Sequence, residues 1–153
     1  MNWEEIVGQK KVIETLKDAI DKERVGHAQL FIGEEGFGVL PLALAYAKEI
    51  LKRENEHAAS KVEHLNHLDL HFSFPVFTEK NNSLSQRLFE DFRNMILENP
   101  YASINDWNEV LDAQNKQLFI SADEVDALNQ KFALKSFEGG TKILIVWRAD
   151  KMN

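Results

Sequence analysis

Glycines spaced for a phosphate-binding loop stand near residue 35, but the residues that would perform its chemistry are absent. Gly33 and Gly38 have the spacing of the G-x-x-x-x-G-K-[ST] signature, and Gly36 lies between them. In a working loop, backbone N–H groups hold the phosphates, a lysine balances their charge and a hydroxyl holds Mg²⁺. Here the lysine position is Val39 and the hydroxyl position is Leu40. The pattern predicts a nucleotide-binding fold that does not turn nucleotide over.

The missing cation should weaken triphosphate binding at this loop. Losing one buried charge partner costs ~2–5 kcal/mol, which is roughly a thirty- to several-thousand-fold loss of affinity. Glu34 and Glu35 add negative charge beside the loop, and Pro41 removes one more N–H donor. We therefore expect no bound ATP. A chance cluster of glycines in an ordinary tight turn is the alternative, and a second element weighs against it.

That second element lies near the end of the sequence. Residues 143–146 form an apolar run typical of a buried parallel strand. In phosphate-loop ATPases this strand ends in acidic residues that hold Mg²⁺, the Walker B element. Those positions are Trp147 and Arg148 here, and Asp150, two residues beyond, is expected to solvate the strand end. Because both elements are degenerate and no other catalytic constellation is present, we expect no catalytic residues and no intrinsic enzyme activity.

The elements that must position these residues alternate between helix and strand. Hydrophobic periodicity predicts helices over 9–24, 41–51, 83–99, 104–111 and 121–132. It predicts strands over 29–32, 68–77 and 142–147. Gly26 is expected to end the first helix, turns are expected at 80–82 and 139–140, and 53–66 are expected to form a loop. Ser83 with Gln86, and Ser121 with Glu124, have capping-box spacing.

This order predicts an α/β fold of the phosphate-loop NTPase type, in which helices cover both faces of a parallel sheet. A sheet with so few strands would leave an open edge. The sequence stops six residues after the last predicted strand. We therefore expect it to be truncated after the Walker B strand.

Composition limits the classes of function. The 153 residues suffice for one domain, and the absence of cysteine excludes disulfides and thiolate metal sites. No apolar run approaches the roughly 20 residues of a membrane helix, so we expect a cytoplasmic protein without a membrane partner. The net charge of −7 argues against direct nucleic-acid binding by this piece, which would need a basic surface.

The sequence resembles the N-terminal AAA+ domains of the delta-prime family of clamp-loader subunits in bacterial DNA polymerase III. The resemblance extends over nearly all of the sequence. It rests on residues 6–9, 26–33, 67–70, 120–121, 135–142 and 150–153. His27-Ala28 before the loop, and Glu-Gly-Gly at 138–140 before the last strand, are fairly specific to clamp-loader subunits.

The resemblance implies a role for each site residue. Val7, Gly8 and Gln9 match a box that lines the adenine pocket in the family. The ATP-hydrolysing gamma and tau relatives carry the lysine and acidic residues that this sequence lacks. It follows that residues 1–153 would be the N-terminal part of an AAA+ domain, with the lid, the collar and the arginine-finger segment further on.

The function implied by the resemblance is that of a non-hydrolysing stator, which helps to load the sliding clamp on DNA. The implied partners are gamma/tau-type and delta-type subunits, with indirect association with the sliding clamp and primed DNA. Two alternatives stay open at this point. One is an ATP-hydrolysing subunit of the gamma type, and the other is a protein-interaction domain outside replication.

The sequence departs from the family at a zinc-binding stretch. Clamp-loader subunits of this type often hold zinc with four cysteines before the second strand, whereas this sequence has four histidines there: His57, His64, His67 and His71. Three of them have metal-like spacing, but the last lies in a predicted strand, so their rings would not converge. We expect structural or solvent-facing histidines and no zinc.

Overall fold

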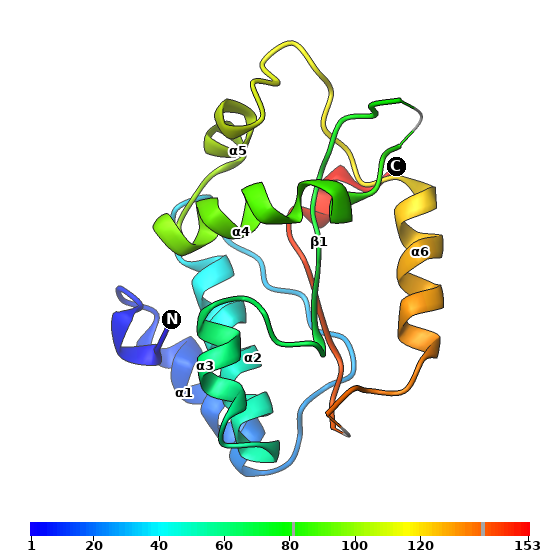
Figure 1. The fold of residues 1–153 in the computed structure, drawn as a ribbon. Coiled ribbons are helices and arrows are strands. Elements are labelled where there is room, and N and C mark those ends of the chain that lie inside the picture. The colour runs from blue at the N-terminus through cyan, green and yellow to red at the C-terminus, as the bar shows by residue number, and fades with distance from the viewer. Residues whose placement is uncertain (81, 139) are drawn as a thin grey trace.

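Two short parallel strands surrounded by helices organise the chain (Figure 1). The computed structural model describes residues 1–80, 82–138 and 140–153. Its α-helices are α1 Lys10–Asp21, α2 Val39–Glu54, α3 Ala58–Glu63, α4 Phe89–Glu98, α5 Ile104–Val110 and α6 Ala122–Ala133. Its strands are β1 Leu70–Ser73 and β2 Ile143–Val146, and its 3₁₀ helices are η1 Trp3–Glu5, η2 Ser85–Leu88 and η3 Ala149–Lys151.

The strands β1 and β2 confirm two of the predicted strands and the α/β class. They pair in parallel, with Leu70 opposite Ile143 and Ser73 opposite Val146. Strand β1 ends before Pro75, as a residue without an N–H requires. In Figure 1 the helices α2 and α3 lie to the left of the two strands and α6 lies to the right.

The main hydrophobic core lies between β1 and the helices α2 to α5. Phe74 stacks on Phe92 with ring centroids 3.9 Å apart, and Trp107 meets Phe74 edge-on at 5.4 Å. The indole Nε1–H of Trp107 donates to the carbonyl oxygen of Pro75 over 2.8 Å. Each of the three rings is at most 1% exposed. Burying a large apolar side chain stabilises a fold by about 1.5–3 kcal/mol, so this cluster fixes α4 and α5 against β1.

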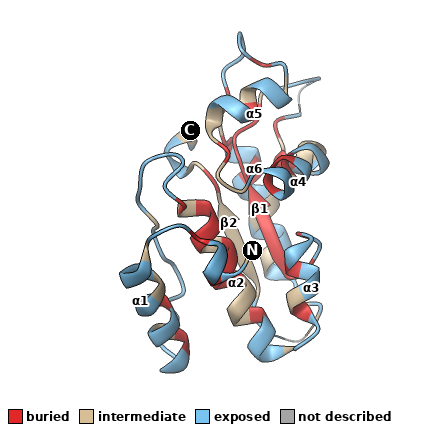
Figure 2. Cartoon of the chain, turned by 90° about the vertical axis from the view of Figure 1, so that its left-hand side faces the viewer, coloured by how far each residue is buried: buried red, intermediate tan, exposed pale blue. Residues whose placement is uncertain are grey.

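A smaller core joins η1 and α1 to one side of α2, whose buried residues are marked in red in Figure 2. Leu16 and Ile20, four positions apart on α1, face this core. The helix ends at Asp21, earlier than predicted, and Gly26 is not what ends it. Glu23 takes a left-handed backbone with φ of 54°, and the N–H of Arg24 closes on the carbonyl oxygen of Ala19 at 2.8 Å.

The predicted strand at residues 29–32 is wrong. This segment forms neither helix nor strand, and Leu30 is 77% exposed while Ile32 is 86% exposed. Short apolar runs specify a strand only when a neighbouring strand supplies hydrogen bonds. In the part of the chain that the structure describes, the sheet consists of β1 paired with β2. Residues 29–32 therefore have no strand in this sheet to pair with.

The expected loop at residues 53–66 contains helix α3 instead. Ala58 and Val62, four positions apart, are 0% and 3% exposed and belong to the main core. Sequence periodicity does not reveal this helix, because it has only six residues and two of them are buried. Its stability comes from packing on α2, and short helices depend on such packing rather than on propensity.

The two predicted capping boxes behave differently. Ser83 does not cap a helix, because its hydroxyl donates to the Ser121 hydroxyl oxygen at 2.9 Å and α4 begins only at Phe89. Ser121 does cap α6, accepting the Glu124 N–H at 3.1 Å. The Glu124 carboxylate does not complete the box, since it accepts the N–H of Ser85 at 2.8 Å and also its hydroxyl.

The remaining expectations concern turns and membranes. Each predicted turn, 80–82 and 139–140, includes a residue outside the described ranges, Asn81 and Gly139 respectively. Across the described ranges, none of the helices has the length and apolar character needed to cross a bilayer.

Candidate functional site: a degenerate phosphate loop

The loop before α2 has the backbone of a tight glycine turn. Gly36 and Gly38 have φ of 79° and 87°, in the left-handed region that favours glycine. Gly38 is the N-cap of α2, and its carbonyl oxygen accepts the N–H of Leu42 at 2.9 Å. The glycine loop followed directly by a long helix is therefore confirmed, although the strand expected before it is not formed.

The side chains that replace the lysine and the hydroxyl do not reach toward a ligand. The Val39 side chain folds back over the start of the loop. Its Cγ2 lies so close to Gly33 that a Cβ at residue 33 would be only 2.6 Å away. Leu40 is 6% exposed and belongs to the main core. Neither group can bind an anion or a metal ion. Val39 instead packs on Gly33 of the loop, and Leu40 packs into the main core.

The segment Val7-Gly8-Gln9 does meet the loop. Gln9 Nε2 donates to the carbonyl oxygen of Phe37 at 3.2 Å. The Val7 N–H donates to the Tyr101 hydroxyl oxygen at 3.1 Å. Val7 itself is 81% exposed, so it closes no pocket among the described residues.

Tyr101 links this segment to the loop, and sequence reasoning missed it. A Cβ at Gly38 would lie 3.4 Å from the Tyr101 ring and 3.8 Å from Ile6. No local pattern around Asn99-Pro100 signals this role. Tyr101 is brought to the loop by the core packing of α4, which sequence periodicity alone does not place.

The residues at the end of β2 have two different environments. Trp147 is 9% exposed and packs into the main core, with its ring 5.5 Å from that of Phe92. Arg148 has a left-handed backbone with φ of 60° and points its guanidinium at Asp150, with two hydrogen bonds of 2.8 Å. Asp150 is exposed at the strand end as expected, and it also binds Arg148.

Charge pairing sets the titration of both groups. The bidentate contact with Asp150 raises the pKa of Arg148, and the same contact lowers the pKa of Asp150. A guanidinium therefore stands where an ATPase carries an acidic Mg²⁺ ligand. Because a guanidinium only donates hydrogen bonds, this position supplies no oxygen ligand to a metal ion.

Glu35 connects the loop to this strand end. Its carboxylate forms an ion pair with Arg148 and accepts the N–H of Ile104, at the start of α5, at 3.2 Å. The sequence pointed to Glu35 only as added negative charge beside the loop. Its partner lies 113 positions away, so no local signal could have revealed the pair.

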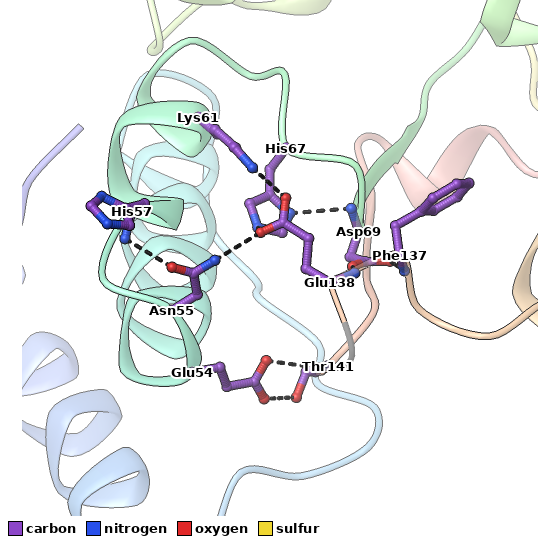
Figure 3. A network of polar contacts seen from close by, with 9 residues as sticks. All are labelled: Glu54, Asn55, His57, Lys61, His67, Asp69, Phe137, Glu138 and Thr141. Atoms are coloured by element: carbon purple, nitrogen blue, oxygen red, sulfur yellow. Dashed lines mark hydrogen bonds and ion pairs between the residues drawn. The ribbon is translucent and has the colours of Figure 1, made fainter.

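A second polar network, shown in Figure 3, positions β2 rather than the loop. The Asp69 carboxylate, 1% exposed, accepts the backbone N–H groups of Phe137 at 2.8 Å and Glu138 at 2.9 Å. The Glu138 carboxylate binds Lys61 at 2.5 Å and Asn55 at 3.0 Å. The pKa of Glu138 is lowered, and its hydrogen bond with Lys61 is the largest cause. The turn before β2 is thereby tied to α3 and β1.

Glu54 and two histidines complete this region. Glu54 at the end of α2 accepts the Thr141 N–H at 2.7 Å and also its hydroxyl. His67 Nδ1 accepts the Asp69 N–H at 3.1 Å, and its Nε2 lies 3.6 Å from the Glu138 carboxylate. His71, in β1, meets the ring of Phe132 on α6 edge-on, with ring centroids 5.3 Å apart.

The four histidines of residues 57–71 do not come together as ligands of a metal ion. His67 and His71 are buried, whereas His57 and His64 are exposed. Burial, and then the charges of Lys131 and Lys142, lower the pKa of His71 to about 4. In residues 1–80, 82–138 and 140–153, no three His, Asp or Glu side chains gather as metal ligands.

The fold and the site together define an α/β domain with a glycine loop whose triphosphate and magnesium positions carry apolar or basic residues. The chain belongs to the family described as "DNA polymerase III, delta subunit", whose model matches residues 8–153. This confirms the resemblance inferred from the sequence.

A curated relative is named DNA polymerase III subunit delta' and comes from Bacillus subtilis (strain 168). It is 32% identical over 106 residues, which are 64% of this chain and 32% of the relative. The matched region spans about a third of the relative's length. No solved structure matches the chain.

Proposed function

We propose that this chain is the N-terminal AAA+ part of a non-hydrolysing, delta-prime-type stator in the clamp loader of DNA polymerase III. The observation that carries the proposal is the replacement of both halves of the nucleotide site. Val39 packs against Gly33, Leu40 is buried in the main core, and the strand end presents Arg148. Family membership supplies the replication context.

The stator would act through assembly rather than chemistry. Its partners would be gamma/tau-type and delta-type subunits, and its contact with the sliding clamp and primed DNA would be indirect. The net charge of −7 supports this indirect association. In this proposal the protein is cytoplasmic, and ATP and zinc are not its cofactors.

Residues 1–153 would hold the part of the AAA+ domain up to the Walker B strand, with helices on both faces of a larger parallel sheet. The exposed Leu30 and Ile32 support a sheet that is larger than β1 and β2 alone. The lid and the collar would then belong to the sequence that follows.

Reconstitution tests the proposal directly. The full-length protein is mixed with gamma/tau-type and delta-type subunits, and assembly is followed by size exclusion while clamp loading is followed on primed DNA. We expect a stable hetero-oligomer, loading that depends on this protein, and no ATP hydrolysis by the protein alone. Absence from the assembly would support an interaction domain outside replication.

Calorimetry with Mg-ATP separates the stator from an ATP-hydrolysing subunit of the gamma type. A low-micromolar affinity, on the order of 8 kcal/mol of binding free energy, together with steady hydrolysis by the protein alone, would support the gamma-type alternative. Elemental analysis showing one zinc per chain would contradict the proposed absence of zinc.

A further inference from the structure

Glu35 and Arg148 join the two halves of the degenerate nucleotide site. Glu35 lies in the glycine loop, and Arg148 is the second residue after β2. In an active phosphate-loop ATPase, the triphosphate and its Mg²⁺ lie between these two elements. In this chain an ion pair made by the protein itself connects them.

Further contacts orient both partners. The Ile104 N–H donates to the same Glu35 oxygen that faces Arg148, at 3.2 Å. Asp150 holds the other side of the guanidinium with two hydrogen bonds of 2.8 Å. The Arg148 side chain is 23% exposed, so the pair is partly shielded from water. Charge-assisted, multiply bonded pairs of this kind have defined geometry.

We infer that Glu35 is an internal substitute for a bound phosphate. Its carboxylate supplies, within the chain, the anion that would otherwise bind Arg148 and the Ile104 N–H. The pair keeps the loop closed without nucleotide. It excludes polyphosphates because Glu35 already binds the Arg148 guanidinium with which they would pair. This goes beyond the stator proposal, because it explains how the loop keeps its shape when no ligand holds it.

The inference predicts a gain of anion binding from one substitution. Glu35→Gln keeps the size of the side chain, removes the competing charge and frees the side of the Arg148 guanidinium that faces the loop, while Asp150 still holds the other side. The loop still lacks a lysine and a Mg²⁺ ligand, so the new binding should be weak and independent of Mg²⁺. We expect tripolyphosphate to bind the variant at least about tenfold more tightly than the unsubstituted protein, a difference of about 1.4 kcal/mol or more.

Glu34→Gln provides the matched control. Glu34 is the exposed neighbour of Glu35, and this substitution removes the same charge without releasing Arg148. The full-length proteins are titrated with sodium tripolyphosphate by calorimetry at low salt, with and without Mg²⁺. We expect the gain for Glu35→Gln but not for Glu34→Gln, and its loss in the double variant Glu35→Gln, Arg148→Gln. Equal binding by the two single variants, or a gain that survives in the double variant, would overturn the inference.

A second readout does not depend on the folding of the Glu35 variant. Arg148→Gln breaks the same pair from the other side. The Phe37 N–H, which donates to the Glu34 carbonyl oxygen at 3.2 Å, and the Ile104 N–H, which donates to Glu35, should therefore open more often. We expect their hydrogen exchange to accelerate at least about threefold while exchange in α4 stays unchanged. Unchanged exchange in the loop would also overturn the inference. Neither measurement uses partner subunits, so its failure is distinct from failure of the stator proposal.

Discussion

The buried carboxylate of Asp69 lies 2.9 Å from the backbone nitrogen of Glu138, whose N–H it accepts. A second oxygen of Asp69 accepts the N–H of Phe137 at 2.8 Å. Asp69 directly precedes β1, and the Ile143 N–H that begins β2 donates to the Asp69 carbonyl oxygen at 2.8 Å. One residue thus fixes both the turn before β2 and the register of the sheet. The position of Arg148 at the end of β2 depends on it.

Asp69→Asn should destabilise the fold markedly. The amide retains one acceptor oxygen for two N–H donors and places an NH₂ group against the other. Hydrogen bonds to charged groups contribute about 1.5–3 kcal/mol, and we expect a loss of that size in urea denaturation. Asp126→Asn, at an exposed position of α6, is the control and should change stability by less than about 0.5 kcal/mol. Equal effects from the two variants would contradict this role for Asp69.

Trp107→Phe tests the centre of the main core. The smaller ring removes the indole N–H, leaves the Pro75 carbonyl oxygen without its 2.8 Å donor and opens a void beside Phe92. An unsatisfied buried acceptor costs about 1–3 kcal/mol. Trp3→Phe makes the same change in the smaller core and should cost less. Urea denaturation of both variants measures the difference, and a smaller loss at Trp107 than at Trp3 would contradict the prediction.

Much of the helical structure could be predicted from the sequence, because α1, α2, α4, α5 and α6 each carry apolar residues at helical spacing. Strand β2 was found for a similar reason, since its four residues are all apolar. Helix α3 was missed because its buried face consists of Ala58 and Val62, which are informative only beside α2. The strand predicted at residues 29–32 failed because pairing is a tertiary property that a short apolar run does not establish.

The candidate site was predictable in its parts but not in its connections. The positions of Val39 and Leu40 followed from glycine spacing alone. The Glu35–Arg148 pair joins residues 113 positions apart, and Tyr101 reaches Val7 across 94 positions. Such contacts depend on how helices pack around the sheet. Periodicity and capping signals act within about one turn of helix, so they carry no information about these pairs.

Gly33 and Val39 should be coupled energetically. A Cβ at residue 33 would approach Val39 Cγ2 to 2.6 Å, so Gly33→Ala must displace the valine or the loop. Such overpacking typically costs about 1–3 kcal/mol. In a Val39→Ala background the obstruction is gone, and the alanine at residue 33 should cost much less. A double-mutant cycle in urea should give a coupling of about 0.5–3 kcal/mol, whereas strictly additive losses would contradict the packing described for the loop.

His71 should make stability depend on pH between about 6.5 and 4. Its pKa is lowered to about 4 in the folded protein by burial and by Lys131 and Lys142, against the opposing charge of Asp69. The unfolded chain therefore binds a proton at His71 that the folded chain excludes, so stability falls as pH decreases through this window. The loss should be on the order of 1–3 kcal/mol.

The measurement is urea denaturation of the unsubstituted protein and His71→Gln at steps from pH 7 to pH 4. Carboxylates whose pKa is lowered by partners, such as Glu138 and Asp150, lose their contribution at the acidic end in both proteins, so the difference between the two curves isolates His71. We expect that difference to change steadily in favour of the glutamine variant as pH falls. His64→Gln, at an exposed position, should run parallel to the unsubstituted protein. A His71→Gln curve that also runs parallel would show that this ring is protonated equally in both states.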